Sequence, residues 1–400
     1  MNFKVKNGLY ALCLATSASF GLVTSTAQAA LVDEGTLSGL QCSGSGVNDS
    51  ANVVGTCTNG VGVNVAFVAL TPGTEQSLPP LTTGRNCSAG MILNNGIIEG
   101  SCVDANAVPR PVVWLPPYSS ATILPPLAGA VRSGTTAINQ NGVSAGVSID
   151  ATATALPVIW LTNSGATALP VGLLGLASTN CSPSDLSDTS GSAQPIVVGN
   201  CPNGNGTSTP VKWTSGLLGY SAAQLALPSG AQACAVSEVN QAGQAMGSCY
   251  FSATSAPNTV QWSASGVPKV LLTVAGSAVR NTGVDMNASG QISGVYLTSA
   301  DFVQPFFWDP STGTNATAIP PLSGGMRASV SGIGDNSEVV GTSEVTSGDS
   351  HPYIWTSLAG TVDQGTLGGS NAGIRSVSKS GNHITGSSEV TGEKSHAFEQ

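Results

Sequence analysis

The stretch "EVVGTSEV" at residues 338–345 is one copy of a glycine-centred pattern that recurs along the chain. Eight such copies lie 45–53 residues apart, centred on Gly55, Gly100, Gly146, Gly199, Gly247, Gly294, Gly341 and Gly386. All six tryptophans follow one of these glycines by 14 or 15 residues. A fixed period of this length is typical of repeat architectures, so the sequence predicts eight copies of one structural unit.

Each unit contains four short runs with the composition of β-strands. In the seventh copy they are "RASVSGI" (327–333), "EVVGTSEV" (338–345), "HPYIW" (351–355) and "TVDQGTL" (361–367), separated by turn residues. Four strands in about 47 residues match one propeller blade, whereas an immunoglobulin-like sandwich needs about twice that length. The sequence therefore predicts an all-β fold, an eight-bladed β-propeller.

The last unit stops after its third strand, at "SHAFEQ" (395–400). Its missing fourth strand has a counterpart at the other end of the chain, because "LVDEGTL" (31–37) matches "TVDQGTL" (361–367). We therefore expect the N-terminal strand 31–37 to pair with the C-terminal strand 394–400 and close the ring.

The cysteines test the strand pairing. Eight of the nine form pairs separated by 15 or 20 residues: Cys42 and Cys57, Cys87 and Cys102, Cys181 and Cys201, Cys234 and Cys249. The second member always lies two residues after a repeat glycine, and each 15-residue pair is centred on the first hairpin turn. Opposed residues of a hairpin lie within bridging distance. We predict four disulfides, in units 1, 2, 4 and 5, rather than a metal site, because no histidine lies nearby.

Residues 1–29 have the features of a secretory signal peptide: Lys4 and Lys6, an apolar stretch that is short for a membrane span, and Ala27-Gln28-Ala29 as a cleavage site. Residues 30–400 would then form one propeller domain in an oxidising compartment, either the periplasm or the cell exterior. With 12 Lys and Arg against 21 Asp and Glu, the composition argues against a nucleic-acid partner. The sequence also predicts no membrane span after residue 29.

The C-terminal repeat resembles a known family. "DQGTLGGS" (363–370), "SGNHITGSS" (380–388) and "SHAF" (395–398) are similar to the extracellular HAF repeat of secreted bacterial proteins, and "GTLSGL" (35–40) is similar to its start. The middle repeats have "LPPL" (78–81 and 124–127) instead, a step that resembles kelch propellers. The resemblance implies a secreted β-repeat protein and no catalytic residues.

Candidate binding residues gather at the loops that enter the innermost strands. Five arginines lie at or near these entries: Arg85, Arg132, Arg280, Arg327 and Arg375. Guanidinium groups there would bind carboxylate or phosphate, or instead bond loop carbonyls and hold adjacent blades in register. Three aromatic residues belong to loops on the same face: Tyr250, Phe251 and Phe302. They would stack on sugar rings or pack between blades.

These observations favour a secreted, non-enzymatic binding propeller with a carbohydrate or protein partner. Its ligand face would combine the innermost-strand entry loops with the loops between second and third strands. The alternative is a polysaccharide lyase or glycosidase with its active site at the channel mouth, and three or more convergent ionisable groups there would favour it. We expect no cofactor and no metal, and we assign no catalytic residue.

Overall fold

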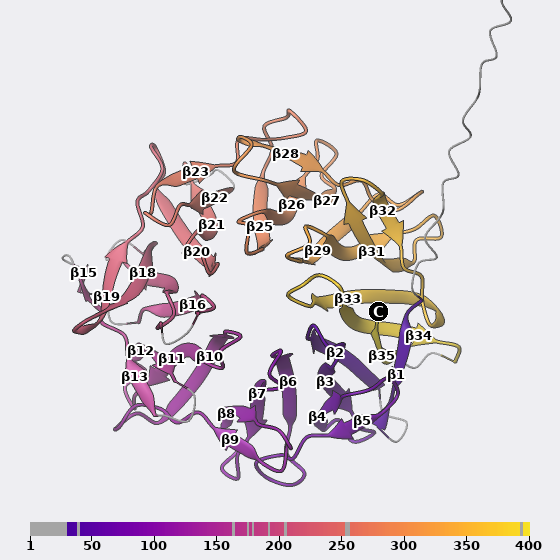
Figure 1. The fold of residues 1–400 in the computed structure, drawn as a ribbon, viewed down its shortest axis with the longest axis horizontal. Helices are drawn as coiled ribbons and strands as arrows, with labels where there is room; N and C mark the ends of the chain where they lie inside the picture. Colours follow the sequence, from indigo (N-terminus) through magenta and orange to yellow (C-terminus); the bar gives the residue numbers. More distant parts are fainter. Residues whose placement is uncertain are drawn as a thin grey trace, which may run out of the picture.

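The computed structural model describes residues 30–37, 41–161, 165–173, 176–177, 180–190, 193–203, 206–252, 257–392 and 395–400. Every regular element in these ranges is a β-strand, and eight antiparallel sheets surround a central axis like blades (Figure 1). The eight-bladed β-propeller is therefore confirmed. Over the same ranges, no helix has the length and hydropathy needed to cross a membrane. The predicted signal peptide, residues 1–29, lies outside the described residues.

Each blade runs from an innermost strand outward. Blade 1 consists of β2 (Gln41–Val47), β3 (Val53–Thr58), β4 (Asn64–Ala69) and β5 (Glu75–Ser77), and blade 2 of β6 (Cys87–Ile92), β7 (Ile98–Val103), β8 (Pro109–Trp114) and β9 (Ala121–Ile123). Blade 3 consists of β10 (Arg132–Ile138), β11 (Ser144–Ile149), β12 (Ala155–Trp160) and β13 (Ala166–Ala168), and blade 4 of β16 (Ser182–Leu186), β17 (Val197–Pro202), β18 (Ser208–Gly216) and β19 (Gly219–Gln224). A small hairpin, β14 (Gly172–Leu173) and β15 (Leu176–Ala177), links blades 3 and 4.

Blade 5 consists of β20 (Ala233–Val239), β21 (Ala245–Tyr250), β22 (Asn258–Trp262) and β23 (Pro268–Val270). Blade 6 consists of β25 (Asn281–Met286), β26 (Ile292–Leu297), β27 (Val303–Trp308) and β28 (Asn315–Ala318), with β24 (Thr273–Val274) added parallel to β28. Blade 7 consists of β29 (Ala328–Ile333), β30 (Val339–Glu344), β31 (Ser350–Thr356) and β32 (Gly360–Asp363), and blade 8 of β33 (Gly368–Val377), β34 (Ile384–Val390), β35 (Ser395–Glu399) and β1 (Val32–Gly35).

The repeat glycines and tryptophans form the contact layers of the blades. A Cβ on Gly100 would lie 2.1 Å from the carbonyl oxygen of Ser88 and 2.8 Å from the Trp114 ring, so no side chain fits there. Trp114 is fully buried, and its indole N–H donates to the carbonyl of Pro79 at 2.9 Å. Trp160 makes the same bond to Pro125. Each "LPPL" segment thus accepts a hydrogen bond from a tryptophan of the next blade.

The two ends of the chain close the ring within one blade. β1 pairs antiparallel with β35, with Val32 opposite Glu399 and Asp33 opposite Phe398. In Figure 1 the indigo β1 lies beside the yellow strands of blade 8. The predicted closure by an N-terminal strand is confirmed.

The four predicted disulfides are also confirmed. Cys42, Cys87 and Cys234 each lie directly opposite their partners in the first hairpin of their blade. All four bridges, including Cys181–Cys201 across the longer turn of blade 4, join Cα atoms 4.0–4.1 Å apart. Bridges of this kind are typical of proteins from oxidising compartments.

Candidate functional site

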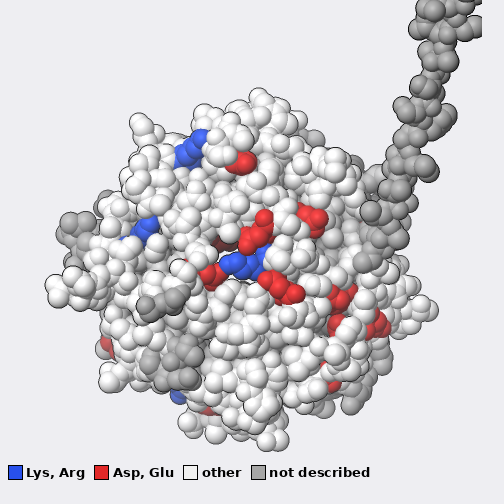
Figure 2. Space-filling view, in the orientation of Figure 1, with Lys and Arg blue, Asp and Glu red and all other residues white. Residues whose placement is uncertain are grey.

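The central channel opens into a cavity of about 330 Å³ at one end of the ring axis. All eight blades line it, through the ends of their innermost strands and the turns that follow. Figure 2 shows a basic side chain in this opening, bordered by acidic ones. This end is opposite to the face formed by the innermost-strand entry loops, because a strand begins on one face and ends on the other.

Three consecutive blades each bury a carboxylate near the end of the innermost strand, and two of the three, Asp185 and Asp285, line the channel. Each innermost strand has a register shift near its end, and Asp185, Glu238 and Asp285 follow that shift in β16, β20 and β25. Each accepts a backbone N–H from the next blade. Val239 donates to Asp185 at 2.9 Å, Met286 donates to Glu238, and Ile333 donates to Asp285 at 2.7 Å. The carboxylates therefore join neighbouring blades around the channel.

Burial raises the pKa of all three groups, to about 7 for Asp185. Repulsion from the other two carboxylates raises the pKa of Glu238 further. The backbone N–H groups lower these pKa values, because they stabilise the ionised form of each carboxylate. Convergent acids with raised pKa values are a feature of catalytic sites as well as of structural networks.

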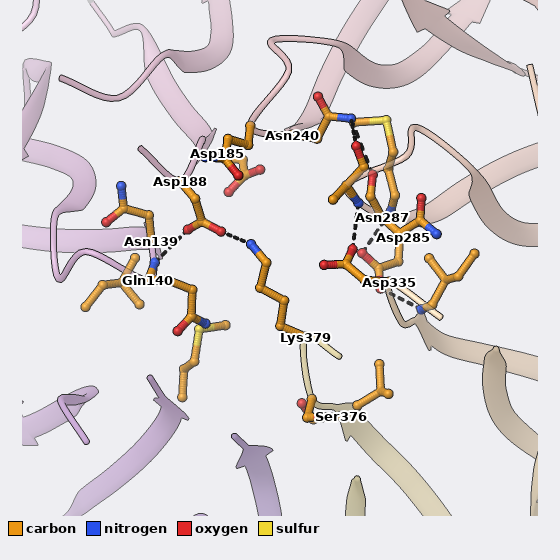
Figure 3. Close-up of a pocket in the computed structure, with 18 of the residues that line it drawn as sticks. Asn139, Gln140, Asp185, Asp188, Asn240, Asp285, Asn287, Asp335, Ser376 and Lys379 are labelled. Carbon is orange, nitrogen blue, oxygen red and sulfur yellow. Dashed lines mark hydrogen bonds and ion pairs between the residues drawn. The ribbon is translucent and has the colours of Figure 1, made fainter. Parts of the chain in front are cut away.

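An ion pair spans the channel. The ammonium group of Lys379, in the first turn of blade 8, contacts Asp188 of blade 4 on the opposite side of the ring (Figure 3). Asp188 also accepts the backbone N–H of Gln140 at 2.7 Å. Lys379 thus lies between the carboxylates of the mouth, as Figure 3 shows for Asp185 and Asp285.

Turn residues join the blades around the same opening. The side-chain amide of Asn48 donates to the carbonyl of Leu93, Asn139 donates to Ser187, and Asn287 donates to Gly334, at 2.9–3.1 Å. Because each acceptor belongs to the next blade, these bonds hold the turns in a ring. They keep the channel carboxylates in a fixed arrangement.

The predicted arginines mostly occupy the opposite face. Arg85, Arg132, Arg280 and Arg327 are exposed, each at or just before the start of an innermost strand. Arg132 borders a shallow pocket with Asp150. Arg375 differs, because it lies near the end of the ten-residue β33, where it lines the channel and its Nε donates to Ser43 at 3.1 Å.

The predicted aromatic residues separate into two groups. Phe251 packs against the buried core of blade 5. Tyr250 is 42% exposed, and the Arg327 guanidinium lies over the Phe302 ring at 5.5 Å. The exposed residues Val303 and Met326 adjoin Phe302 and Arg327 in the chain. Blades 5 to 7 thus combine cationic, aromatic and apolar groups on the entry-loop face.

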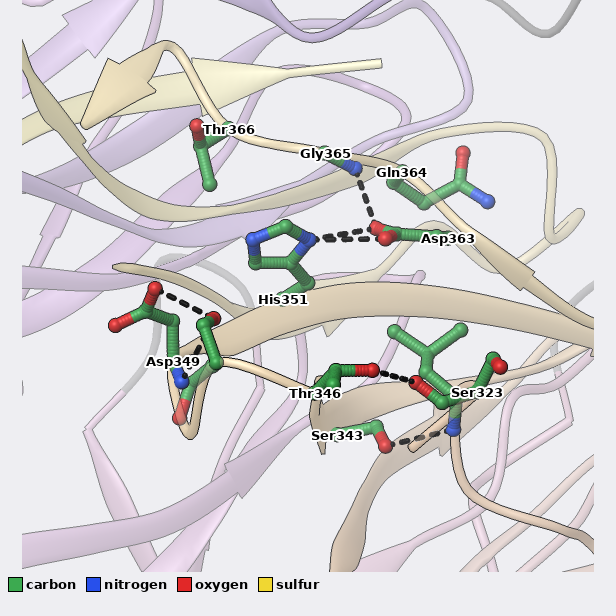
Figure 4. Close-up of polar contacts among 12 residues, drawn as sticks. Ser323, Ser343, Thr346, Asp349, His351, Asp363, Gln364, Gly365 and Thr366 are labelled. Atoms are coloured by element: carbon green, nitrogen blue, oxygen red, sulfur yellow. Dashed lines mark hydrogen bonds and ion pairs between the residues drawn. The ribbon is translucent and has the colours of Figure 1, made fainter. Parts of the chain in front are cut away.

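Two histidines occupy equivalent positions in blades 7 and 8. Nδ1 of His351 lies 2.9 Å from Asp363, and Nδ1 of His396 lies 2.8 Å from Asp33 (Figure 4 shows the first pair). Each pair joins the third strand of a blade to its fourth. Repetition of the same pair in two blades indicates a structural role.

Potential metal ligands converge at one place within the described ranges, where Cys42 and Cys57 lie near Glu75. The two sulfurs form a disulfide, so they offer no thiolate to a metal.

The channel acids were missed from the sequence, although a signal exists. Glu238 and Asp285 both lie nine residues before their repeat glycine, so an alignment of the repeats places them together. Asp185 is displaced from that register by the insertion in blade 4.

Comparisons with known proteins support the fold. No protein-family model matches the chain, and no curated protein does. Among solved structures, the Dos1 propeller is 10% identical with a TM-score of 0.52, over 93% of this chain and 95% of that one. Dipeptidyl peptidase 4 of Porphyromonas gingivalis is 10% identical with a TM-score of 0.56, over 88% of this chain and 56% of its own.

A puromycin-hydrolyzing peptidase of Mycobacterium tuberculosis is 11% identical with a TM-score of 0.52, over 81% of this chain and 53% of its own. This chain therefore spans about half the length of these two peptidases. Likeness at such low identity concerns the propeller fold alone.

Proposed function

We propose that this protein is a non-enzymatic binding propeller that recognises an acidic carbohydrate or an acidic protein surface through its entry-loop face. The observation that carries the proposal is the contact of Arg327 with the Phe302 ring, next to the exposed Val303 and Met326. A guanidinium group binds carboxylates, and aromatic and apolar neighbours contact the faces of sugar rings or apolar side chains. Arg280, in the slot equivalent to Arg327, extends the cationic surface.

The test is a glycan array, with protein pull-down as a second arm, on residues 30–400. The double variant Arg280→Gln/Arg327→Gln should lose most of the binding signal. Lys379→Gln is the matched control, because it removes a positive charge from the opposite face. Equal binding by the double variant and the control would contradict the proposed face.

A lyase or glycosidase is the second candidate, because at least three ionisable groups converge at the channel mouth. Against it, Asp185, Glu238 and Asp285 all accept backbone N–H groups that hold the blades together. A turnover assay on acidic polysaccharides separates the candidates. Binding without turnover would reject the enzyme, and turnover lost in Asp285→Asn but retained in Arg327→Gln would establish it.

We also propose that residues 1–29 direct secretion to the periplasm or the cell exterior. The four disulfides support this proposal, and the resemblance of residues 395–398 to the HAF repeat agrees with it. N-terminal sequencing of the exported protein should begin near Ala30.

A further inference from the structure

We propose that the central channel binds small aliphatic amines, and that a recess between blades 2 and 3 holds one ammonium group on the carboxylate of Glu99. This site is separate from the entry-loop face. It uses residues of β6, β7 and β10, none of which takes part in the proposed carbohydrate or protein recognition.

The recess is a cavity of about 310 Å³. The hydroxyl-bearing residues Ser88, Ser101, Thr135 and Thr136 line it together with Glu99. It shares Met91 and Ile138 with the channel-mouth cavity, so the two spaces adjoin. A volume near 300 Å³ is at the lower end for small-molecule sites and is larger than a bare ion needs.

Glu99 has an unsatisfied acceptor in this recess. The side chain is only 8% exposed, and its Oε1 atom is buried without a hydrogen-bond partner. The Thr135 hydroxyl bonds the carboxyl group but leaves that oxygen free. An unpaired buried acceptor is destabilising, and an ammonium N–H would satisfy it. Burial raises the pKa of Glu99 to about 7, and a bound cation would lower that pKa again.

The blade repeat does not require an acid at this position. Glu99 directly precedes a repeat glycine, and the other blades have uncharged residues there: Val54, Ala145, Val198, Met246, Ser293, Val340 and Thr385. Five of these seven are apolar, as expected for a side chain packed between two sheets. A carboxylate in a packing slot of one blade alone indicates a local role.

The channel itself favours cations. Four acidic residues line the channel mouth, Asp185, Asp188, Asp285 and Asp335, against two basic ones, Lys379 and Arg375. The Lys379 side chain also shows that an alkylammonium group fits among these carboxylates, because it reaches Asp188. Because burial raises the pKa of Asp185 and Asp285, a bound ammonium group would stabilise their ionised forms, which a neutral sugar cannot do. A diamine suits the site best, with one ammonium group on Glu99 and the other toward the acidic mouth.

The test is isothermal titration calorimetry, in which 1,4-diaminobutane or spermidine is titrated into the protein of residues 30–400. We expect saturable binding that Glu99→Gln weakens at least tenfold. Gly90→Val keeps every charge but fills the recess, because a Cβ on Gly90 has only the Glu99 carbonyl nearby, at 3.7 Å. It should weaken binding to a similar extent. Glu344→Gln, the same charge change at the end of β30, should leave the affinity unchanged.

Absence of saturable binding to the wild-type protein would overturn the proposal. So would equal affinities for Glu99→Gln and Glu344→Gln, because they would mean that the amines associate with the acidic surface in general. Thermal unfolding of each variant checks the fold. Should Glu99→Gln unfold, Gly90→Val decides, since it leaves the carboxylate in place.

Discussion

Nδ1 of His396 lies 2.8 Å from a carboxylate oxygen of Asp33, and this contact joins residues 363 positions apart in the chain. It reproduces the His351–Asp363 pair of blade 7. The N-terminal strand therefore occupies the fourth-strand position of blade 8 down to the level of a single side-chain pair.

Deleting residues 30–37 should lower the melting temperature of the whole protein. The deletion exposes the edge of β35, which contains the fully buried Ala397 and Phe398, and leaves the ring open. Asp33→Asn should have a smaller effect, about 0.2–1 kcal/mol, as is typical of partly exposed ion pairs. Asp363→Asn, which breaks the equivalent pair away from the closure, is the control. An unchanged melting temperature in the deletion variant would refute closure by this strand.

The buried Glu34 should make stability fall as the pH rises. Its pKa is raised from 4.5 to about 7, chiefly by burial; the backbone N–H of Gly73 opposes this rise, and the charges of Glu399 and Asp33 add to it. The folded state thus holds this proton more tightly than the unfolded state, so its contribution is complete below about pH 4.5 and is lost as the pH approaches 7.

Glu34→Gln should remove this part of the pH dependence and stabilise the protein at neutral pH. The corresponding position of blade 7 already has a glutamine, Gln364. Denaturant unfolding between pH 5 and 8 measures the effect. A variant whose pH profile parallels that of the wild type would show that Glu34 does not titrate in this way. Glu75 and Glu99, with pKa values also raised to about 7 by burial, would account for the remaining slope.

Removing the Cys234–Cys249 bridge should lower the free energy of unfolding by about 3 kcal/mol, the value expected for a 15-residue loop. The double variant Cys234→Ser/Cys249→Ser tests this by urea denaturation. The wild type under reducing conditions, which lacks all four bridges, should lose more. Equal stability of oxidised and reduced wild-type protein would contradict the prediction.

Trp213→Phe should destabilise the protein by about 1–3 kcal/mol, because it leaves the carbonyl of Pro170 without its 2.8 Å indole donor. Trp308→Phe is an informative comparison, since Trp308 donates to Gly313 within its own blade. Trp213→Phe keeps an aromatic ring above the repeat glycine Gly199, and in blade 6 the ring above Gly294 belongs to Phe306, which Trp308→Phe leaves in place. Thermal unfolding should therefore show a cooperative transition in each, at a lower temperature than in the wild type.

The fold was largely predictable from the sequence, because strand spacing, turn residues and cysteine separations are local properties that the repeat displays eight times. Closure by residues 31–37 was predictable for the same reason. The channel site was not, because Lys379 and Asp188 lie 191 residues apart and meet only when the ring forms. Glu99 differs from its counterparts in the alignment, but its burial and its free oxygen depend on blade 3. Arg375 follows a different spacing from the other arginines, so its place in the channel was also missed.

The pairing of β1 with β35 has a consequence for biosynthesis. β1 is made long before its partner, Ser395–Glu399, because Asp33 and His396 lie 363 positions apart in the chain. Until Ser395–Glu399 leaves the ribosome, β1 has no partner strand in blade 8. Contacts between such distant segments form slowly, and unpaired strands are prone to associate with other chains. Protection of this nascent N-terminal segment should therefore govern the yield of correctly folded protein.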